Sequence, residues 1–340
     1  MAERNLFAFF GVCCASALAF LGLLSGVAYL VGLLPDDMPL RLERAGMIAA
    51  SSAEESRAPE EESVFSSAVN EETKRAEDES APEEAGLIAV ASLDLSRKNA
   101  KDGLSLQNET SYKIDLSEYA NATVAAGDIY GAPPTVLIYH THGTESYSPG
   151  ASYDASYGFR SEDISKNVVS AGEALCDSLR AYGVFAIHDE NMYDKDDFSA
   201  AYTKSRAAVE EWLKKYPTVR YVIDIHRDSV SSGGAAAAAV AEIEGRRAAQ
   251  IMFVVGTDEK AGRHTGWETN LALAVKLQTS LAAISPSLVR PVYLRKASFN
   301  QDISPGALII EIGSQGNTAE EAAYSAYLLA KVMAECLSGE

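Results

Sequence analysis

Three side chains with the chemistry of metal ligands follow two apolar, strand-like runs of this chain. The run VLIY, which begins at Val136, is followed by His142 and Glu145, and the run YVIDI ends at His226. A buried strand delivers the residues after it to one edge of its sheet, so His-x-x-Glu in a turn there aims an imidazole and a carboxylate at one point. Two histidines and a glutamate form one of the ligand sets of catalytic zinc. The sequence therefore predicts a Zn²⁺ site with ligands His142, Glu145 and His226.

A fourth residue supplies the proton chemistry that a hydrolytic zinc site needs. Glu311 ends the apolar run ALIIE, which predicts another buried strand. A carboxylate beside the metal moves protons between the attacking water and the leaving group. We expect Glu311 to be this general acid/base. The competing interpretation is structural, because a lone histidine or acid at a strand end is often only a hydrogen-bonding group.

The other histidines have two interpretations each. His140 lies two residues before His142, so we expect it to face the same side, either near substrate or behind a ligand, unless it is a packed core histidine. His188 ends the run VFAIH and either lines the cleft or is structural. His264 lies in the polar loop AGRHTG, where we expect it to be solvated.

Nearby charged residues complete the set of candidates. Arg227 either neutralises a substrate carboxylate or pairs with Asp228. Asp163 and Asp228 are reserve oxygen ligands, and Asp224 is either another reserve ligand or a buried acid behind the site. A serine nucleophile is not indicated, because the chain has no G-x-S-x-G motif.

The elements that position these residues alternate strand-like and helix-like periods from about residue 128 onward, which predicts an α/β fold. A capping box at Thr318 and Glu321 opens the expected C-terminal helix. The other expected helices cover 164–179, 200–216 and 267–284, the strands cover 136–138, 184–187, 219–226, 288–294 and 307–312, and a hairpin covers 236–243 and 248–255.

The N-terminal part of the chain has a different composition. Leu6 to Leu34 carries no charged residue and is either a membrane-spanning helix or a signal sequence. The apolar run is longer than that of a usual cleaved signal, so we favour a retained anchor over 1–36. Arg4 before the span and two aspartates after it favour a cytoplasmic N-terminus, which places the rest of the protein outside the cytoplasm. This predicts a single-pass protein of the cell membrane.

Residues 37–127 are predicted to be an acidic, largely disordered tether, because 49–82 is rich in Glu, Ser and Ala and nearly lacks aromatic residues. Residues 86–115 are either linker or a docking strand. The net charge of -19, from 48 acids and 29 bases, argues against a nucleic-acid partner. The four cysteines show neither metal spacing nor a disulfide framework.

The stretches IYHTHGTESY, IDIHRDS and FNQDISPGALIIEIGSQGNT resemble the stage II sporulation protein P (SpoIIP) family of zinc-dependent cell-wall hydrolases. The resemblance covers about 135–336. It implies an open mixed sheet flanked by helices, as in zinc amidases and carboxypeptidases, in a catalytic domain over 128–340. The family is similar to amidases whose third zinc ligand lies farther downstream, where this chain has Glu162 or Asp163. We favour Glu145, because His-x-x-Glu resembles the pair of zinc carboxypeptidases.

The resemblance also implies a function. The expected activity is that of a membrane-anchored N-acetylmuramoyl-L-alanine amidase, which cuts peptidoglycan between N-acetylmuramic acid and the stem peptide during spore engulfment. The alternatives are a zinc endopeptidase acting on stem-peptide cross-links and a scaffold that binds cell wall without catalysis. The implied partners are the sporulation proteins D and M.

Overall fold

The computed structural model describes residues 86–97, 100, 103–120, 122, 129–260 and 262–337. The predicted anchor over 1–36 and most of the predicted tether lie outside the described residues. Within the described ranges, no helix has both the length and the apolar composition that crossing a membrane requires.

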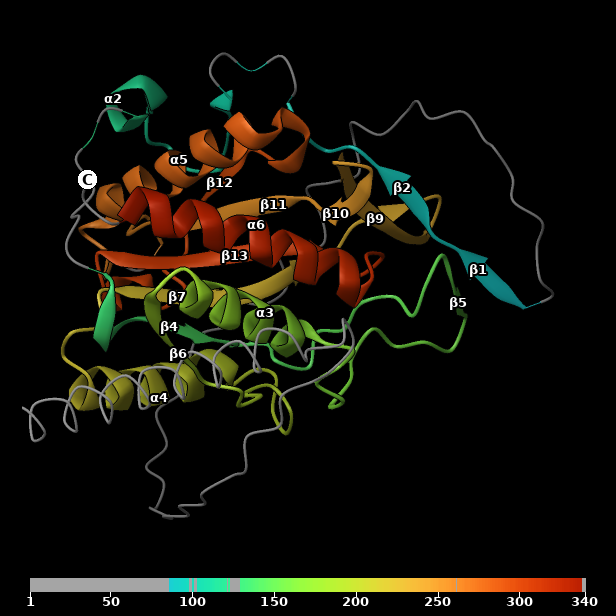
Figure 1. Cartoon of the computed structure of the whole chain (residues 1–340), viewed down its shortest axis with the longest axis horizontal. Helices are drawn as coiled ribbons and strands as arrows, with labels where there is room; N and C mark the ends of the chain where they lie inside the picture. The colour runs from blue at the N-terminus through green and yellow to red at the C-terminus, as the bar shows by residue number, and fades with distance from the viewer. Residues whose placement is uncertain are drawn as a thin grey trace, which may run out of the picture. The chain divides into compact units, whose positions relative to one another are not determined.

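A seven-stranded mixed sheet forms the centre of the fold (Figure 1). Its order is β3-β12-β11-β13-β7-β4-β6, with β3 (Leu106–Asn108), β12 (Val292–Arg295), β11 (Ile251–Gly256), β13 (Gly306–Ser314), β7 (Tyr221–Asp228), β4 (Gly131–Tyr139) and β6 (Val184–His188). The pair β11 and β13 is antiparallel, and every other neighbouring pair is parallel. Strands β13, β7, β4 and β6 therefore end at the same edge, where the predicted site residues emerge.

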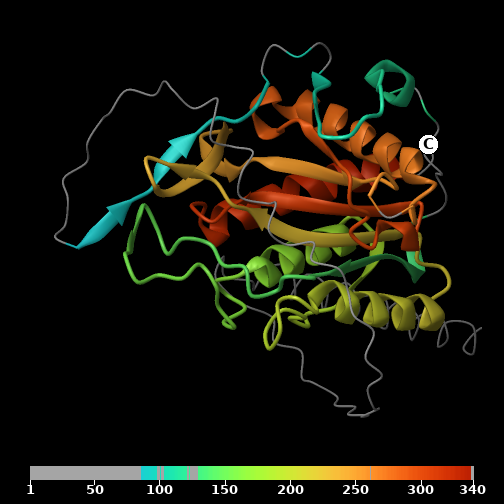
Figure 2. The ribbon, with the colours of Figure 1, turned by 180° about the vertical axis from the view of Figure 1, so that it is seen from behind.

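Helices cover the two faces of this sheet unequally (Figures 1 and 2). The helices are α3 (Val168–Ala181), α4 (Ala201–Lys215), α5 (Trp267–Ile284) and α6 (Ala319–Leu337). Helices α3, α5 and α6 share one hydrophobic core with Ile223 and Ile225 of β7, whereas Val209 of α4 packs on the opposite face with Val222. Side chains alternate along a strand, so His226 projects toward the α4 face.

Helix starts follow from local capping. In α6 the predicted capping box is confirmed, since the Glu321 N–H donates to Thr318 Oγ1 at 3.2 Å and the Thr318 N–H donates to Glu321 Oε2 at 3.3 Å. Helix α3 begins later than predicted. Asn167 caps it by accepting from the Val169 N–H at 3.0 Å, and Ile164 lies before this cap, exposed.

The predicted hairpin is confirmed as β9 (Ala235–Ile243) and β10 (Arg246–Ala249), which pair antiparallel. Its two turn residues, Glu244 and Gly245, both have positive φ, 53° and 75°, as a tight two-residue hairpin requires. The second arm was expected to be continuous to residue 255. Instead the chain leaves the hairpin at Gln250 and continues as β11 in the central sheet.

The folded part begins earlier than the boundary at 128 that the sequence suggested. Strand β1 (Leu87–Ala89) pairs with β5 (Ser152–Asp154), β2 (Ala91–Leu93) pairs with β9, and β3 pairs with β12 of the central sheet. Helix α2 (Leu116–Ala120) contacts α5. These strands have three residues each and are at most half-buried, so composition alone does not reveal them. Part of the predicted tether is thus docked on the domain.

Candidate metal centre

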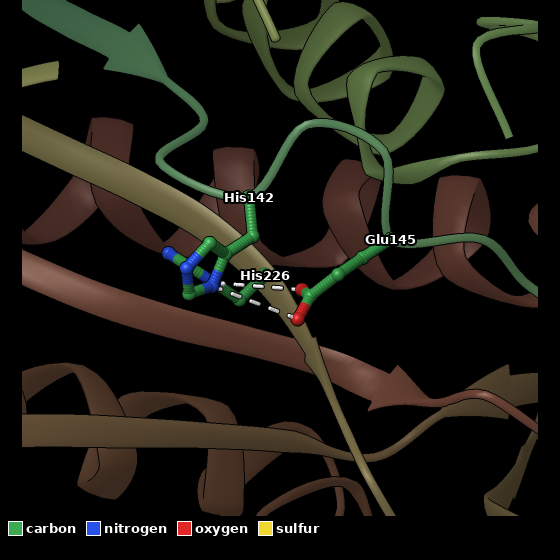
Figure 3. A group of neighbouring side chains, drawn as sticks. All are labelled: His142, Glu145 and His226. Carbon is green, nitrogen blue, oxygen red and sulfur yellow. Dashed lines mark ion pairs between the residues drawn. The ribbon is translucent and has the colours of Figure 1, made fainter. Parts of the chain in front are cut away.

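The structure brings the three predicted ligands together at one edge of the sheet (Figure 3). His142 and Glu145 lie in the turn after β4, and His226 lies near the end of β7. One ligand atom from each residue lies within 4.8 Å of the other two, and all three residues are buried. Among the described residues, this is the group of His, Cys, Asp and Glu side chains that matches a metal site of three or more ligands.

The Glu145 carboxylate faces both imidazoles, which contact each other edge-on. Its Oε1 is 3.8 Å from His142 Nδ1 and its Oε2 is 3.4 Å from His226 Nδ1 (Figure 3). The Arg227 N–H donates to Glu145 Oε2 at 3.2 Å, which orients the carboxylate. Both Nδ1 atoms therefore face the same carboxylate, so the three donor atoms converge.

Asp224 fixes the other side of His226. Its Oδ1 lies 2.9 Å from His226 Nε2 and accepts from the Thr141 N–H at 2.8 Å, while Oδ2 accepts from Thr141 Oγ1 at 2.6 Å. A carboxylate behind a histidine leaves the other ring nitrogen for a metal and fixes its direction. Of the two roles predicted for Asp224, the structure places it as a buried acid behind the site. Asp224 also ties the turn that carries His142 to β7.

The charges of the cluster oppose the effect of burial. Burial would raise the pKa of Glu145, but the Arg227 guanidinium and the two imidazoles outweigh it and lower this pKa below its usual range. Burial likewise would lower the pKa of His226, but the carboxylates of Asp224 and Glu145 raise it well above 6.5. For His142, burial dominates and lowers the pKa to about 4. An ionised carboxylate facing two imidazoles is a donor set that fits a divalent cation such as zinc.

Glu311 lies directly beside this cluster. It pairs in register with His226 across β13 and β7, so both side chains project from the same face of the sheet. Glu311 is 2% exposed, and its Oε2 has no hydrogen-bond partner among the described residues. Burial raises the pKa of Glu311 to about 8, with Asp228 and Glu145 adding to the effect and His226 opposing it. A buried acid with a free oxygen is suited to exchange a proton.

An aromatic wall that the sequence analysis missed covers the site from the α4 side. The Phe198 ring stacks on His142 with centroids 4.4 Å apart, and Tyr202 of α4 meets the same imidazole edge-on at 5.5 Å. The loop after β6 also packs tightly against the turn that carries His142, since a Cβ added to Gly143 would lie 2.8 Å from Met192 Cγ. An aromatic residue in a polar loop carries no signal of its own, so only the fold reveals this wall.

His140 was expected on the same side as His142, and this is wrong. Val136 and Ile138 of β4 face the α3 core and His140 continues that alternation, whereas His142 lies in the turn after the strand and faces the other side. His140 lies under α3, with Nδ1 3.1 Å from the Ile225 carbonyl oxygen and Nε2 2.8 Å from His188 Nε2. Both are therefore packed histidines on the opposite face, and His188 does not line the cleft.

Arg227 adopts neither of its two predicted roles. Its Nε donates to the Ser146 carbonyl oxygen at 3.1 Å and its Nη2 to that of Phe159 at 3.0 Å. Asp228 pairs instead with Arg290 Nη2 at 2.7 Å. The side chain of Arg227 is 8% exposed and points into the protein, so it holds two loops beside Glu145 rather than meeting a substrate.

Three other candidates lie away from the centre. Glu162 pairs with Lys195 at 2.7 Å, and Asp163 pairs with Lys166 at 2.9 Å, and neither acid joins the three-residue cluster. The geometry thus favours Glu145 as the third ligand. His264 was expected to be solvated but is 3% exposed, because the loop packs it near Asn270, 3.4 Å away.

Comparisons with solved structures found distant similarity. Solved structures with low similarity include the N-acetylmuramyl-L-alanine amidase Ami1 from Mycobacterium smegmatis, 13% identical, covering 63% of this chain and all of that chain with a TM-score of 0.37. Another is the CwlD amidase from Clostridioides difficile in complex with the GerS lipoprotein, 12% identical, covering 61% of this chain and all of that chain with a TM-score of 0.37. TM-scores this low place no constraint on the site.

Sequence similarity is more informative. The chain is 29% identical over 220 residues to stage II sporulation protein P of Bacillus subtilis (strain 168), which covers 60% of this chain and 51% of that protein. The chain thus spans about half the length of this relative. The family model for stage II sporulation protein P (SpoIIP) matches residues 36–334. Because this match covers most of the sequence, including every residue of the candidate metal centre, the chain belongs to the stage II sporulation protein P family.

Proposed function

We propose that this protein is a zinc-dependent peptidoglycan amidase that cleaves the amide between N-acetylmuramic acid and the stem peptide. The observation that carries the proposal is the convergence of His142, Glu145 and His226 beside the buried carboxylate of Glu311. Nitrogen and oxygen donors from three residues suit zinc and leave a position for water. Family membership supports peptidoglycan as the substrate class.

The residues of the chain divide the work as follows. Zinc held by the three residues would acidify a water molecule and polarise the scissile carbonyl. Glu311 takes the proton of the attacking water at Oε2, which has no other partner among the described residues, and returns it to the departing amine nitrogen. The raised pKa helps this carboxyl group to hold the proton between the two steps. Asp224 keeps the His226 ring in place throughout.

The setting of this reaction is also part of the proposal. The apolar run within 1–36 would anchor the chain in the cell membrane as a single span, with the catalytic domain on the extracytoplasmic side, where peptidoglycan lies. Membership of a sporulation family supports engulfment as the occasion and the sporulation proteins D and M as partners.

Digestion of purified cell wall by the full-length chain in detergent tests the function. An amidase releases intact stem peptides from the sugar, whereas an endopeptidase cuts cross-links and leaves the stems attached, and mass analysis of the products separates the two. Metal analysis of the same preparation should find one zinc per chain. Hydrolysis that persists at the full rate after complete zinc removal contradicts the mechanism, and zinc-loaded protein that yields no product supports a binding scaffold instead.

A further inference from the structure

A pocket opens directly beside the metal centre. It has a volume of about 620 Å³, within the range of small-ligand sites. It shares Phe198 with the aromatic wall over His142, and Thr144 lies in the same turn as the ligand Glu145. The lining residues are Thr144, Arg160, Ser161, Glu162, Asp194, Lys195 and Phe198. A substrate held at the centre would extend into this pocket.

Arg160 is the most firmly held cation of the pocket. Its Nη1 donates to Asp194 Oδ2 at 2.6 Å, and Asp194 in turn accepts from the Thr144 N–H at 3.1 Å and from Thr144 Oγ1 at 2.5 Å. The guanidinium carbon lies 4.4 Å from the centroid of Phe198. The Arg160 backbone forms a bridge with that of Glu145. The guanidinium is therefore fixed relative to the metal ligands before any substrate arrives.

The backbone before Arg160 is also held in an unusual conformation. Phe159 has a φ of 51°, in the left-handed region that a bulky residue rarely adopts. Its carbonyl oxygen accepts from Arg227 Nη2 and from the Ser146 N–H, both at 3.0 Å. Such strain persists only where the surroundings enforce it, and it clusters at functional sites. Phe159 directly precedes Arg160, which lines the pocket.

The guanidinium keeps unused donors on its open side. Among the described residues, only Nη1 of Arg160 has a hydrogen-bond partner, so Nε and Nη2 remain for a ligand. The side chain of Arg160 is 39% exposed. The side chain of Asp194 is fully buried, and its oxygens already accept hydrogen bonds from Thr144 and Arg160. Two adjacent guanidinium donors match the two oxygens of a carboxylate.

We propose that this pocket is a subsite for a free carboxylate of the stem peptide, with Arg160 as the residue that recognises it. The inference rests on the proposed function for its substrate and adds how that substrate is selected. A chain with a net charge of -19 repels anionic ligands at long range, so an acidic substrate needs a local cation at the site. Lys195 lies at the rim in an exposed pair with Glu162, which a substrate carboxylate can replace at little cost.

The test uses muramoyl peptides that are either free or amidated, one carboxyl group at a time, with the full-length zinc-loaded chain in detergent. We expect kcat/KM to fall about 10-fold to 100-fold when the recognised carboxyl group is amidated, as for a lost charge-assisted hydrogen bond. Arg160→Gln should lose this preference and hydrolyse the free and amidated peptides at similar rates. Arg160→Lys should keep only part of the preference, because an ammonium keeps the positive charge but lacks the two parallel N–H donors of a guanidinium.

The control is Lys166→Gln, which removes an exposed cation from the same loop outside the pocket and should keep the full preference. A purely structural role for Arg160 would lower the activity on both peptides equally and leave their ratio unchanged, which overturns the proposal. The proposal is also overturned if the parent protein hydrolyses every amidated peptide as efficiently as the free peptide.

Binding to the Glu311→Gln variant separates this proposal from the proposed function. If the free peptide binds at least 10-fold more tightly than one amidated form, and Arg160→Gln added to this variant removes the difference, the subsite stands even where the parent shows no hydrolysis. Equal binding of all peptides, or no binding of any, refutes the subsite, whereas hydrolysis by the parent still supports the amidase.

Discussion

Asp224→Asn tests whether the carboxylate behind His226 prepares the metal centre. Asp224 faces His226 Nε2 at 2.9 Å and receives both donors of Thr141 at 2.8 and 2.6 Å. The asparagine amide can accept from the Thr141 N–H and donate to the Thr141 hydroxyl, but it removes the negative charge that faces His226. The carboxylate and the His226 imidazole form a buried ion pair, and losing a contact to a charged group typically costs about 1.5–3 kcal/mol. We therefore expect zinc affinity to fall about 10-fold to 150-fold.

The assay is a competition titration with a chromophoric zinc chelator at one fixed pH, with thermal melting measured on the same samples. Asp228→Asn is the matched control, because it removes the same charge from the same strand but breaks the pair with Arg290 instead. The control should lose stability and keep its zinc affinity within about 3-fold of the parent. Unchanged affinity in Asp224→Asn, or an equal loss in Asp228→Asn, would show that the carboxylate does not orient His226.

Three further predictions concern single residues. Glu145→Ala should weaken zinc binding by more than about 100-fold while the exposed Asp163→Ala leaves it unchanged, and the reverse pattern in metal analysis would move the third ligand downstream. Glu311→Gln should keep its zinc but lose about 100-fold to 10,000-fold in product release, so a variant as active as the parent excludes the proton-transfer role. Burial, together with the charges of His140 and Arg180, lowers the pKa of His188 well below 6.5 in the folded protein. Below pH 6.5 the unfolded chain therefore binds a proton at His188 that the folded chain does not bind, so the free energy of unfolding decreases as the pH falls. Urea midpoints at pH 7.5 and 5 should show this fall, and His188→Asn should make it shallower.

The sequence predicted the parts of the site that depend on strand ends. Long apolar runs are buried strands whatever their neighbours, and parallel strands meet at one edge, so His142, His226 and Glu311 could be placed together without coordinates. The preference for Glu145 over Glu162 and Asp163 depended on a short local spacing, His-x-x-Glu. The structure brings Glu145, and neither of the other two acids, to the two histidines, while its role as a ligand stays a prediction.

The sequence did not predict the features that depend on which side of the sheet a residue faces, or on hydrogen-bond partners that lie far away in the chain. His140 and His142 face opposite sides because a turn follows β4 before His142, and a continuous pattern of apolar and polar residues does not mark this turn. The partners of Arg227 are carbonyl oxygens of two loops, and backbone acceptors leave no trace in side-chain types. Arg160 was missed for the same reason, because its orientation depends on the φ of Phe159 and on Asp194, which is 34 residues away in sequence.

The position of β13 determines when the candidate site can be completed during synthesis of the chain. This strand lies between β11 and β7 although it is the last strand in the sequence, so the two halves of the sheet cannot join until it leaves the ribosome. The three candidate metal ligands are all translated by residue 226, but Glu311 arrives with β13. A nascent or truncated chain that ends before β13 therefore cannot transfer the proton. Under the proposed function, hydrolysis therefore waits until β13 has joined the sheet.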